Sequence, residues 1–157
     1  MTLTTDLYQE LILEHNKSPK NFGLLEHPSH QAEGYNPLCG DHYHLYFKIG
    51  ADQIIQAVSF QGQGCAISKA SASIMTAAVK GKSIEYARQL FKEFKMLLAG
   101  ELDPERDVNI LGKLKVFSGI WQYPSRVKCA NLAWHALNAA LRGEETISTE
   151  KDEKDHA

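Results

Sequence analysis

The sequence has no long apolar run, no large net charge of either sign and only three cysteines. No stretch approaches the ~20 consecutive apolar residues that cross a bilayer, which argues against a membrane-spanning helix. The net charge of -2 gives no reason to expect nucleic acid or an anionic membrane as the partner. The segment Met1–Leu13 carries Asp6 and Glu10 and has no cationic start followed by an apolar core, so we expect no secretory signal.

The number and spacing of the three thiols exclude one class of small protein. Cys39, Cys65 and Cys129 are odd in number and far apart, so they do not make a disulfide framework. In a chain for which no export signal is expected, we expect them to work as reduced thiols, and we predict a cytoplasmic protein. The absence of any C-x-x-C pair also argues against a redox dithiol protein.

What is present fits one globular domain. The chain has 157 residues, of which 43% are hydrophobic and 23% charged. It is long enough to bury a hydrophobic core without disulfide or metal crosslinks. Residues 1–142 are predicted to form that single domain. Residues 143–157 carry six acidic side chains without a core pattern and are predicted to be a disordered tail.

Local patterns predict both strands and helices. Alternation of apolar and polar residues predicts a strand at His42–Ile49, and the run Ile54–Gln61 after a turn predicts a hairpin partner. Residues 31–35 are a candidate short strand. Capping residues and apolar stripes predict helices in five segments: one that ends by Ser18, one from Cys65 to Gly81, one from Ser83 to Gly100, a short one within 108–117 and a last one to about Leu141.

The tripeptide Cys39-Gly40-Asp41 directly precedes the strongest strand pattern and is the first candidate for chemistry. In extended backbone its thiol and carboxylate point the same way, with anchors roughly 6–7 Å apart, which is close enough to share a metal ion. Gly40 between them permits backbone angles that other residues resist and leaves space for another group to approach.

The other two thiols also lie at element boundaries, where sites are commonly built. Cys65 follows a glycine-rich turn and opens a helix, whose N-terminal dipole lowers the pKa of a thiol. Cys129 lies near the start of the last helix. Each cysteine could instead be a small buried hydrophobe, but the glycine-flanked turns around Cys39 and Cys65 are not apolar runs. We therefore predict that all three thiols and Asp41 meet at one site.

Three thiolates favour a soft or borderline metal, and a carboxylate completes a tetrahedral set suited to zinc. The spacing itself is a weak signal, because it matches no zinc-finger pattern. A histidine could replace the carboxylate. His42 is expected to point away from Asp41, whereas His44 is expected to return to the Cys39 face further along the strand. Asp41 is thus the preferred fourth ligand and His44 the alternative.

Two cations, Arg126 and Lys128, precede Cys129 at the start of the last helix. Cations at that end of a helix oppose its dipole, so a merely solvated position explains them poorly. Zinc with three thiolates and a carboxylate carries net negative charge, which a nearby guanidinium would offset. We therefore expect a supporting role for Arg126, with a weaker case for Lys128.

At these residues the chain resembles the U-type family of iron–sulfur cluster assembly proteins, IscU and SufU. The resemblance covers almost everything from residue 5 to 142 and rests on three segments: Asn-Pro-Leu-Cys39-Gly-Asp41, Gly-Gln-Gly-Cys65-Ala-Ile-Ser-Lys-Ala-Ser-Ala-Ser and Arg126-Val-Lys-Cys129-Ala-Asn-Leu-Ala-Trp. Lys128 stands where IscU proteins carry histidine, and the segment around residues 88–112 is longer than in IscU. Both features resemble the SufU branch.

The resemblance implies an α+β fold, in which helices pack on one face of a small antiparallel sheet of about three strands. It implies a zinc site made by Cys39, Asp41, Cys65 and Cys129, and a SufS-type cysteine desulfurase as partner. The residue that matches the family's sulfur acceptor is Cys39. The implied activity is therefore sulfurtransferase-like, with downstream iron–sulfur assembly proteins as further partners.

Two other functions would use the same residues. The three cysteines with Asp41 could hold a transient [2Fe-2S] cluster or iron, which would make the protein a scaffold for cluster assembly. Alternatively, the zinc could support folding alone, as in a structural zinc module.

Overall fold

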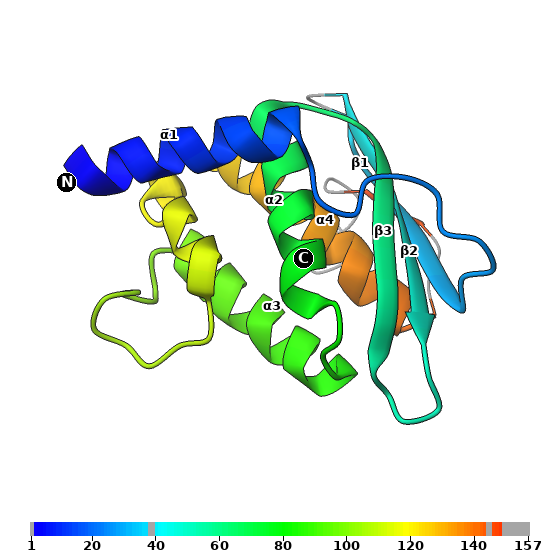
Figure 1. The fold of residues 1–157 in the computed structure, drawn as a ribbon. Coiled ribbons are helices and arrows are strands. Elements are labelled where there is room, and N and C mark those ends of the chain that lie inside the picture. Colours follow the sequence, from blue (N-terminus) through cyan, green and yellow to red (C-terminus); the bar gives the residue numbers. More distant parts are fainter. Residues whose placement is uncertain (1, 38–39, 144–145, 149–157) are drawn as a thin grey trace.

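The computed structural model describes residues 2–37, 40–143 and 146–148. In chain order the elements are α1 (Thr2–Lys17), β1 (His30–Asn36), β2 (Asp41–Ile49), β3 (Ile55–Gln63), α2 (Ala66–Val79), α3 (Ile84–Leu98), the 3-10 helices η1 (Gly112–Phe117) and η2 (Ile120–Gln122), α4 (Pro124–Leu141) and β4 (Thr146–Ser148). The helices gather on one side of the sheet (Figure 1). This confirms the predicted α+β architecture with helices packed on one face.

The sheet is built around β2, which pairs antiparallel with β1 on one side and with β3 on the other. Along β2, Tyr43, Leu45 and Phe47 are buried beneath the helices, whereas His42 faces solvent, as the alternation predicts. The antiparallel pairing of three strands is confirmed.

A fourth strand, β4, pairs parallel with the outer edge of β1 and gives the strand order β3-β2-β1-β4. It lies inside residues 143–157, where the sequence pattern predicts no strand. The edge of β1 offers unpaired backbone groups, which a short segment can use whatever its side chains are. Residues 144–145 and 149–157 lie outside the described part, so a disordered tail there stays a prediction.

Helices α2 and α4 pack closely, and this packing positions the site. The hydroxyl of Ser71 on α2 donates to the backbone oxygen of Ala130 on α4 at 2.6 Å. The indole N–H of the fully buried Trp134 donates to the oxygen of Ser71 at 3.1 Å. The small alanine and serine side chains of α2 permit this approach. Together the two bonds hold the middle of α2 against α4.

The segment between α3 and α4 differs in detail from the prediction. Ser83 caps α3 by accepting from the backbone N–H of Tyr86, as its position predicts. Residues 108–117 contain the 3-10 helix η1, which covers only their second half and buries Leu114 and Phe117.

Among the described residues no helix is long and apolar enough to cross a membrane.

Candidate metal centre

One carboxylate and two thiols meet at one point of the fold. Ligand atoms of Asp41, Cys65 and Cys129 all lie within 4.8 Å of one another, and the described residues contain no second group of three such side chains as tight as this. Asp41 begins β2, Cys65 caps α2 and Cys129 lies in the second turn of α4. Three elements distant in sequence thus supply one donor each. Cys39, the predicted fourth member, lies outside the described residues.

Asp41 and Cys65 hold one another in position. The backbone N–H of Cys65 donates to Oδ1 of Asp41 at 2.9 Å, and the Cys65 sulfur lies 3.9 Å from the other carboxylate oxygen. The backbone N–H of Ser68 in turn donates to the Cys65 sulfur at 3.4 Å. Asp41 is almost fully buried, whereas Cys65 is exposed. The buried carboxylate is therefore pinned by a backbone donor, and the thiol at the rim remains open to solvent.

Gly64 is the residue that lets these groups approach. A Cβ at this position would lie 2.5 Å from Oγ of Ser68, 2.6 Å from the hydroxyl of Tyr43 and 2.7 Å from Oδ1 of Asp41. Real Cβ atoms do not come so close to other heavy atoms, so any other residue would push these groups apart. The hydroxyls of Tyr43 and Ser68 are themselves 3.0 Å apart and hydrogen-bonded. Gly64 therefore serves close approach at the site.

The surroundings of Cys65 favour its thiolate form. Its hydrogen bond with Cys129 and the hydrogen bonds from Ser68 lower the pKa of Cys65 to about 6, although burial and the Asp41 carboxylate both act to raise it. Donor atoms of a tetrahedral zinc site with Zn–S bonds of about 2.3 Å are about 3.8 Å apart. Here the Cys65 sulfur lies 3.9 Å from an Asp41 oxygen, and all three ligand atoms lie within 4.8 Å of one another. The residues present fit a zinc ion, and a third thiol would complete its coordination.

Arg126 lies on the first turn of α4, three residues before Cys129. Its guanidinium stacks over the ring of Tyr123 with the central carbon 4.6 Å from the ring centre. Both residues line a cavity of about 260 Å³ that Tyr8 of α1 also lines. The pKa of Tyr8 is raised, chiefly by burial; Arg126 acts to lower it and Cys65 to raise it. Tyr8 therefore lies close enough to Arg126 and to Cys65 for their charges to affect its pKa. Lys128 is half-buried on the same helix.

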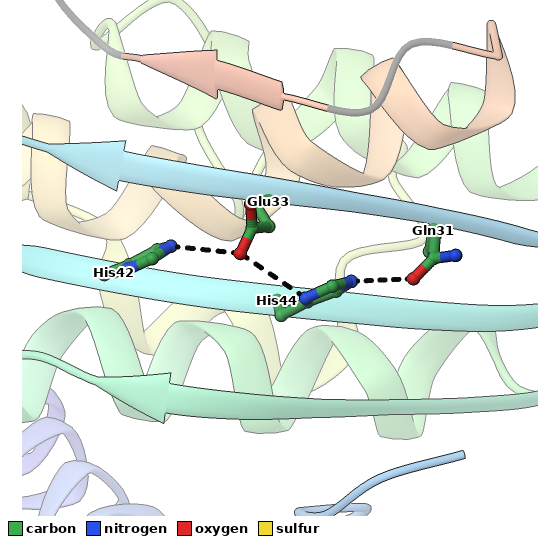
Figure 2. Close-up of polar contacts among 4 residues, drawn as sticks. All are labelled: Gln31, Glu33, His42 and His44. Carbon is green, nitrogen blue, oxygen red and sulfur yellow. Dashed lines mark hydrogen bonds and ion pairs between the residues drawn. The ribbon is translucent and has the colours of Figure 1, made fainter. Parts of the chain in front are cut away.

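The structure does not bring His44 to the metal centre. Its ring lies on the solvent face of the sheet, where Nδ1 is 3.5 Å from Glu33 and Nε2 is 2.9 Å from the amide oxygen of Gln31 (Figure 2). His44 therefore does not approach Asp41, and the structure gives no support to it as the alternative fourth ligand. A strand has a period of two, so His44 points the same way as His42 and opposite to Asp41.

Sequence reasoning also missed two residues that support the site. It assigned no site role to Ser68, whose backbone and hydroxyl contact Cys65, and none to Tyr43, whose hydroxyl bonds to Ser68. A signal for Ser68 was available: it stands three positions after the N-cap Cys65, where a backbone N–H points back at the capping side chain.

A buried carboxylate and two thiols that converge near the start of two helices form a donor set typical of metal-binding sites. Comparison with known proteins shows which family the chain belongs to. The family model described as NifU-like N terminal domain matches residues 7–130. The chain belongs to this family, which includes the IscU and SufU iron–sulfur cluster assembly proteins.

Three relatives illustrate the similarity. The zinc-dependent sulfurtransferase SufU of Bacillus subtilis is 41% identical over 140 residues, which cover 88% of this chain and 92% of that protein. The iron–sulfur cluster assembly scaffold protein IscU of Streptococcus pyogenes is 38% identical, with 87% of this chain and 83% of that protein covered. A crystal structure of an assembly scaffold protein for the SUF system from Fervidobacterium islandicum superposes with a TM-score of 0.79 at 36% identity, covering 87% and 97% of the two chains.

Proposed function

We propose that the protein is a zinc-binding sulfur acceptor in iron–sulfur cluster biogenesis, which takes sulfur onto Cys39 from the persulfide of a SufS-type cysteine desulfurase. The observation that supports this most is the convergence of Asp41, Cys65 and Cys129 within 4.8 Å of one another. Asp41 directly follows the Cys39-Gly40 segment in the sequence. The similarity to a zinc-dependent sulfurtransferase over most of both chains supports the same reading.

Asp41, Cys65 and Cys129 would hold the zinc together with Cys39. When bound, zinc keeps its thiol ligands deprotonated near neutral pH. Asp41 is positioned for this by the backbone N–H of Cys65, and Cys65 by Ser68. Gly40 has a left-handed backbone with φ of +77°, which glycine adopts without strain, so the chain turns at Gly40 directly before Asp41.

The transfer itself is a thiol exchange that needs no outside oxidant. The Cys39 thiolate attacks the terminal sulfur of the partner's persulfide. The partner's S–S bond breaks, a new S–S bond forms on Cys39, and the electron pair leaves on the partner's cysteine as a thiolate. The proton on the terminal sulfur moves with that sulfur to Cys39. Downstream iron–sulfur assembly proteins would then receive this sulfur. Such chemistry requires reduced thiols, and a cytoplasmic location remains our prediction.

Arg126 is proposed to support this site from its edge. Arg126 is exposed, lies over the ring of Tyr123 and stands three residues before Cys129 on α4, so it can offset negative charge at the site and contact a docked desulfurase. It is a positioning residue, because no reacting atom is assigned to it. Replacing it with lysine keeps the charge and removes the stacked planar group, which separates the two contributions.

The test is stimulation of a SufS-type desulfurase by Cys39→Ala. We expect the variant to lose stimulation while a control on the distant exposed loop, Val108→Ala, keeps it. Unchanged stimulation by Cys39→Ala would overturn the acceptor role. If zinc serves folding alone, Cys39→Ala should lower thermal stability and leave sulfur transfer without a specific loss, so the melting temperature is measured on the same samples.

A scaffold function is the second candidate, because relatives that match most of this chain are named scaffold proteins. In that case the same donors would hold a transient [2Fe-2S] cluster. Colour separates the two functions: protein reconstituted with iron and sulfide becomes brown and absorbs visible light if it holds a cluster. A sulfur acceptor that holds zinc stays colourless.

A further inference from the structure

The solvent face of the sheet carries a second cluster of metal-binding side chains, apart from the thiol centre. Glu33 projects from β1, and His42 and His44 project from β2 beside it. Oε1 of Glu33 lies 3.4 Å from Nε2 of His42 and 3.5 Å from Nδ1 of His44 (Figure 2). One carboxylate oxygen thus faces a ring nitrogen of each histidine.

The register of the sheet produces this arrangement. Glu33 pairs directly with His44 across the β1–β2 ladder, and His44 pairs with Gln61 across β2–β3. His42 is two residues before His44 and therefore projects from the same face. Glu33, His42, His44, Gln61 and Gly62 line a hollow of about 200 Å³, and Gly62 adds no side chain that would fill it.

The hydrogen bond on the far side of His44 involves Nε2 and leaves Nδ1 facing Glu33. Nε2 of His44 donates to the amide oxygen of Gln31 at 2.9 Å, and the ring also stacks on Tyr46 with centres 4.3 Å apart. With its proton on Nε2, a neutral His44 presents the lone pair of Nδ1 toward the Glu33 carboxylate. Two acceptors then face one another across 3.5 Å, and a cation between them would relieve the repulsion.

Two of the donor-to-donor distances suit a transition-metal ion. With ligands at about 2.1 Å in tetrahedral geometry, donor atoms are about 3.4 Å apart, which matches both carboxylate-to-imidazole distances. An imidazole whose other nitrogen donates to an oxygen acceptor is also the usual arrangement of a metal-ligating histidine. The three donors do not all lie as close to one another as the ligand atoms of the thiol centre do. However, the side chains of His42 and Glu33 are 55% and 42% exposed and can rotate to close on an ion.

We propose that Glu33, His42 and His44 form a second divalent transition-metal site, with Gln31 orienting His44. The ligand class is an ion that imidazole prefers, such as Zn²⁺ or Ni²⁺, because two nitrogens and one carboxylate are poor ligands for Mg²⁺. The site is open to solvent and supplies three ligands, so it binds its ion more weakly than the thiol centre does and leaves a position for water or a further ligand.

The experiment is a zinc titration of the full-length protein, after its metal content as purified has been measured. Wild type is expected to take up one zinc ion more than the thiol centre accounts for. His44→Ala and His42→Ala are expected to lose that additional ion, and Gln31→Leu is expected to weaken its binding by about 10-fold. The control is His27→Asn, a change at an exposed loop histidine whose left-handed backbone asparagine tolerates. Retention of the additional ion by His44→Ala, or its absence from wild type, would overturn the proposal.

Paramagnetic Ni²⁺ gives a second readout that does not depend on stoichiometry. Substoichiometric Ni²⁺ is expected to broaden the ring proton signals of His42 and His44 before those of the other histidines, and Mg²⁺ is expected to change none of them. Uniform broadening of all the histidine signals would contradict a defined site. Because these side chains lie on the surface, the variants should fold, and circular dichroism checks this.

Discussion

The two faces of β2 carry two polar clusters of opposite character. On the inner face, Asp41 is nearly fully buried and contacts Cys65 at the start of α2. On the outer face, His42 and His44 meet the Glu33 carboxylate in solvent. The inner cluster is tight because two helices and a strand converge on it. The outer cluster is looser because it lies in solvent, where only the strand pairing and the contacts of His44 with Gln31 and Tyr46 position it. Burial therefore decides which cluster is preorganised, although one strand supplies both.

The largest expected effect separates the two faces directly. Cys129→Ala removes a buried donor of the inner cluster, so we expect zinc affinity there to fall by more than about 100-fold. Loss of a residue that only hydrogen-bonds to a metal ligand typically costs about 10–100-fold. His44→Ala should leave the same affinity within about twofold, because its ring lies on the other face. Competition with a chromophoric chelator measures both. A large loss with His44→Ala would mean that the faces are not independent.

Gly64→Ala tests whether close packing makes the inner cluster tight. The added Cβ would overlap Ser68, Tyr43 and Asp41, so we expect a loss of about 1–3 kcal/mol in unfolding free energy, together with weaker zinc retention. The matched control is Gly50→Ala, where the crowding atoms are the ends of exposed side chains that can move, and the cost should be about 0.5 kcal/mol or less. Urea denaturation of both variants measures the difference. Equal costs would contradict the packing argument.

Ser68→Ala sharpens the same point with a smaller change. Its hydroxyl bonds to Tyr43 and to the backbone oxygen of Cys65, so the variant should lose about 1–2 kcal/mol of stability. Ser59→Ala is the control, because Oγ of Ser59 is buried without a hydrogen-bond partner among the described residues. Its removal should cost almost nothing or stabilise the fold. A Ser59→Ala cost as large as that of Ser68→Ala would show that the network adds nothing.

The contrast between buried and exposed side chains extends to the histidines and gives the smallest expected effect. Burial lowers the pKa of His15, which also lies near Lys113 and Lys20; only Glu14 acts to raise it. The unfolded chain then binds a proton at higher pH than the folded protein does. Stability should therefore fall as pH drops below about 6.5 toward the lowered pKa.

Urea denaturation at several pH values between about 7.5 and 5 checks this, since 6.5 is the ordinary pKa of histidine. His15→Gln should show a shallower loss of stability than wild type, and the exposed-loop variant His27→Asn should show the wild-type slope. An unchanged slope in His15→Gln would mean that burial does not keep this imidazole neutral.

Much of the fold follows from local sequence patterns. The alternation from Tyr43 to Phe47, the cap at Ser83 and the apolar stripes predict most strands and helices, because each depends on neighbours within a few positions. The strand β4 was not predictable, since it depends on the open edge of β1. The 3-10 helix within residues 108–117 also follows from packing, because Leu114 and Phe117 are drawn into the core.

The convergence of Asp41, Cys65 and Cys129 was predictable in outline, whereas Cys39, the fourth predicted member, lies outside the described residues. Glycine-flanked thiols point to Cys65, and residue spacing places Asp41 on the inner face of β2. The approach of Cys65 to Cys129, in contrast, depends on how closely α2 packs against α4 through Ser71, which no local pattern contains. The misplacement of His44 has a simpler cause, because a period of two places it with His42. Metal ligation by the inner cluster stays a prediction.

The most direct test of the account is to find where the sulfur arrives. The zinc-loaded protein is mixed with a SufS-type desulfurase and cysteine, alkylated, digested and examined by peptide mass spectrometry. The account predicts one additional sulfur atom on the peptide that contains Cys39, and none on those that contain Cys65 or Cys129. Sulfur on Cys65 or Cys129 instead, or on no cysteine of this protein, would contradict it.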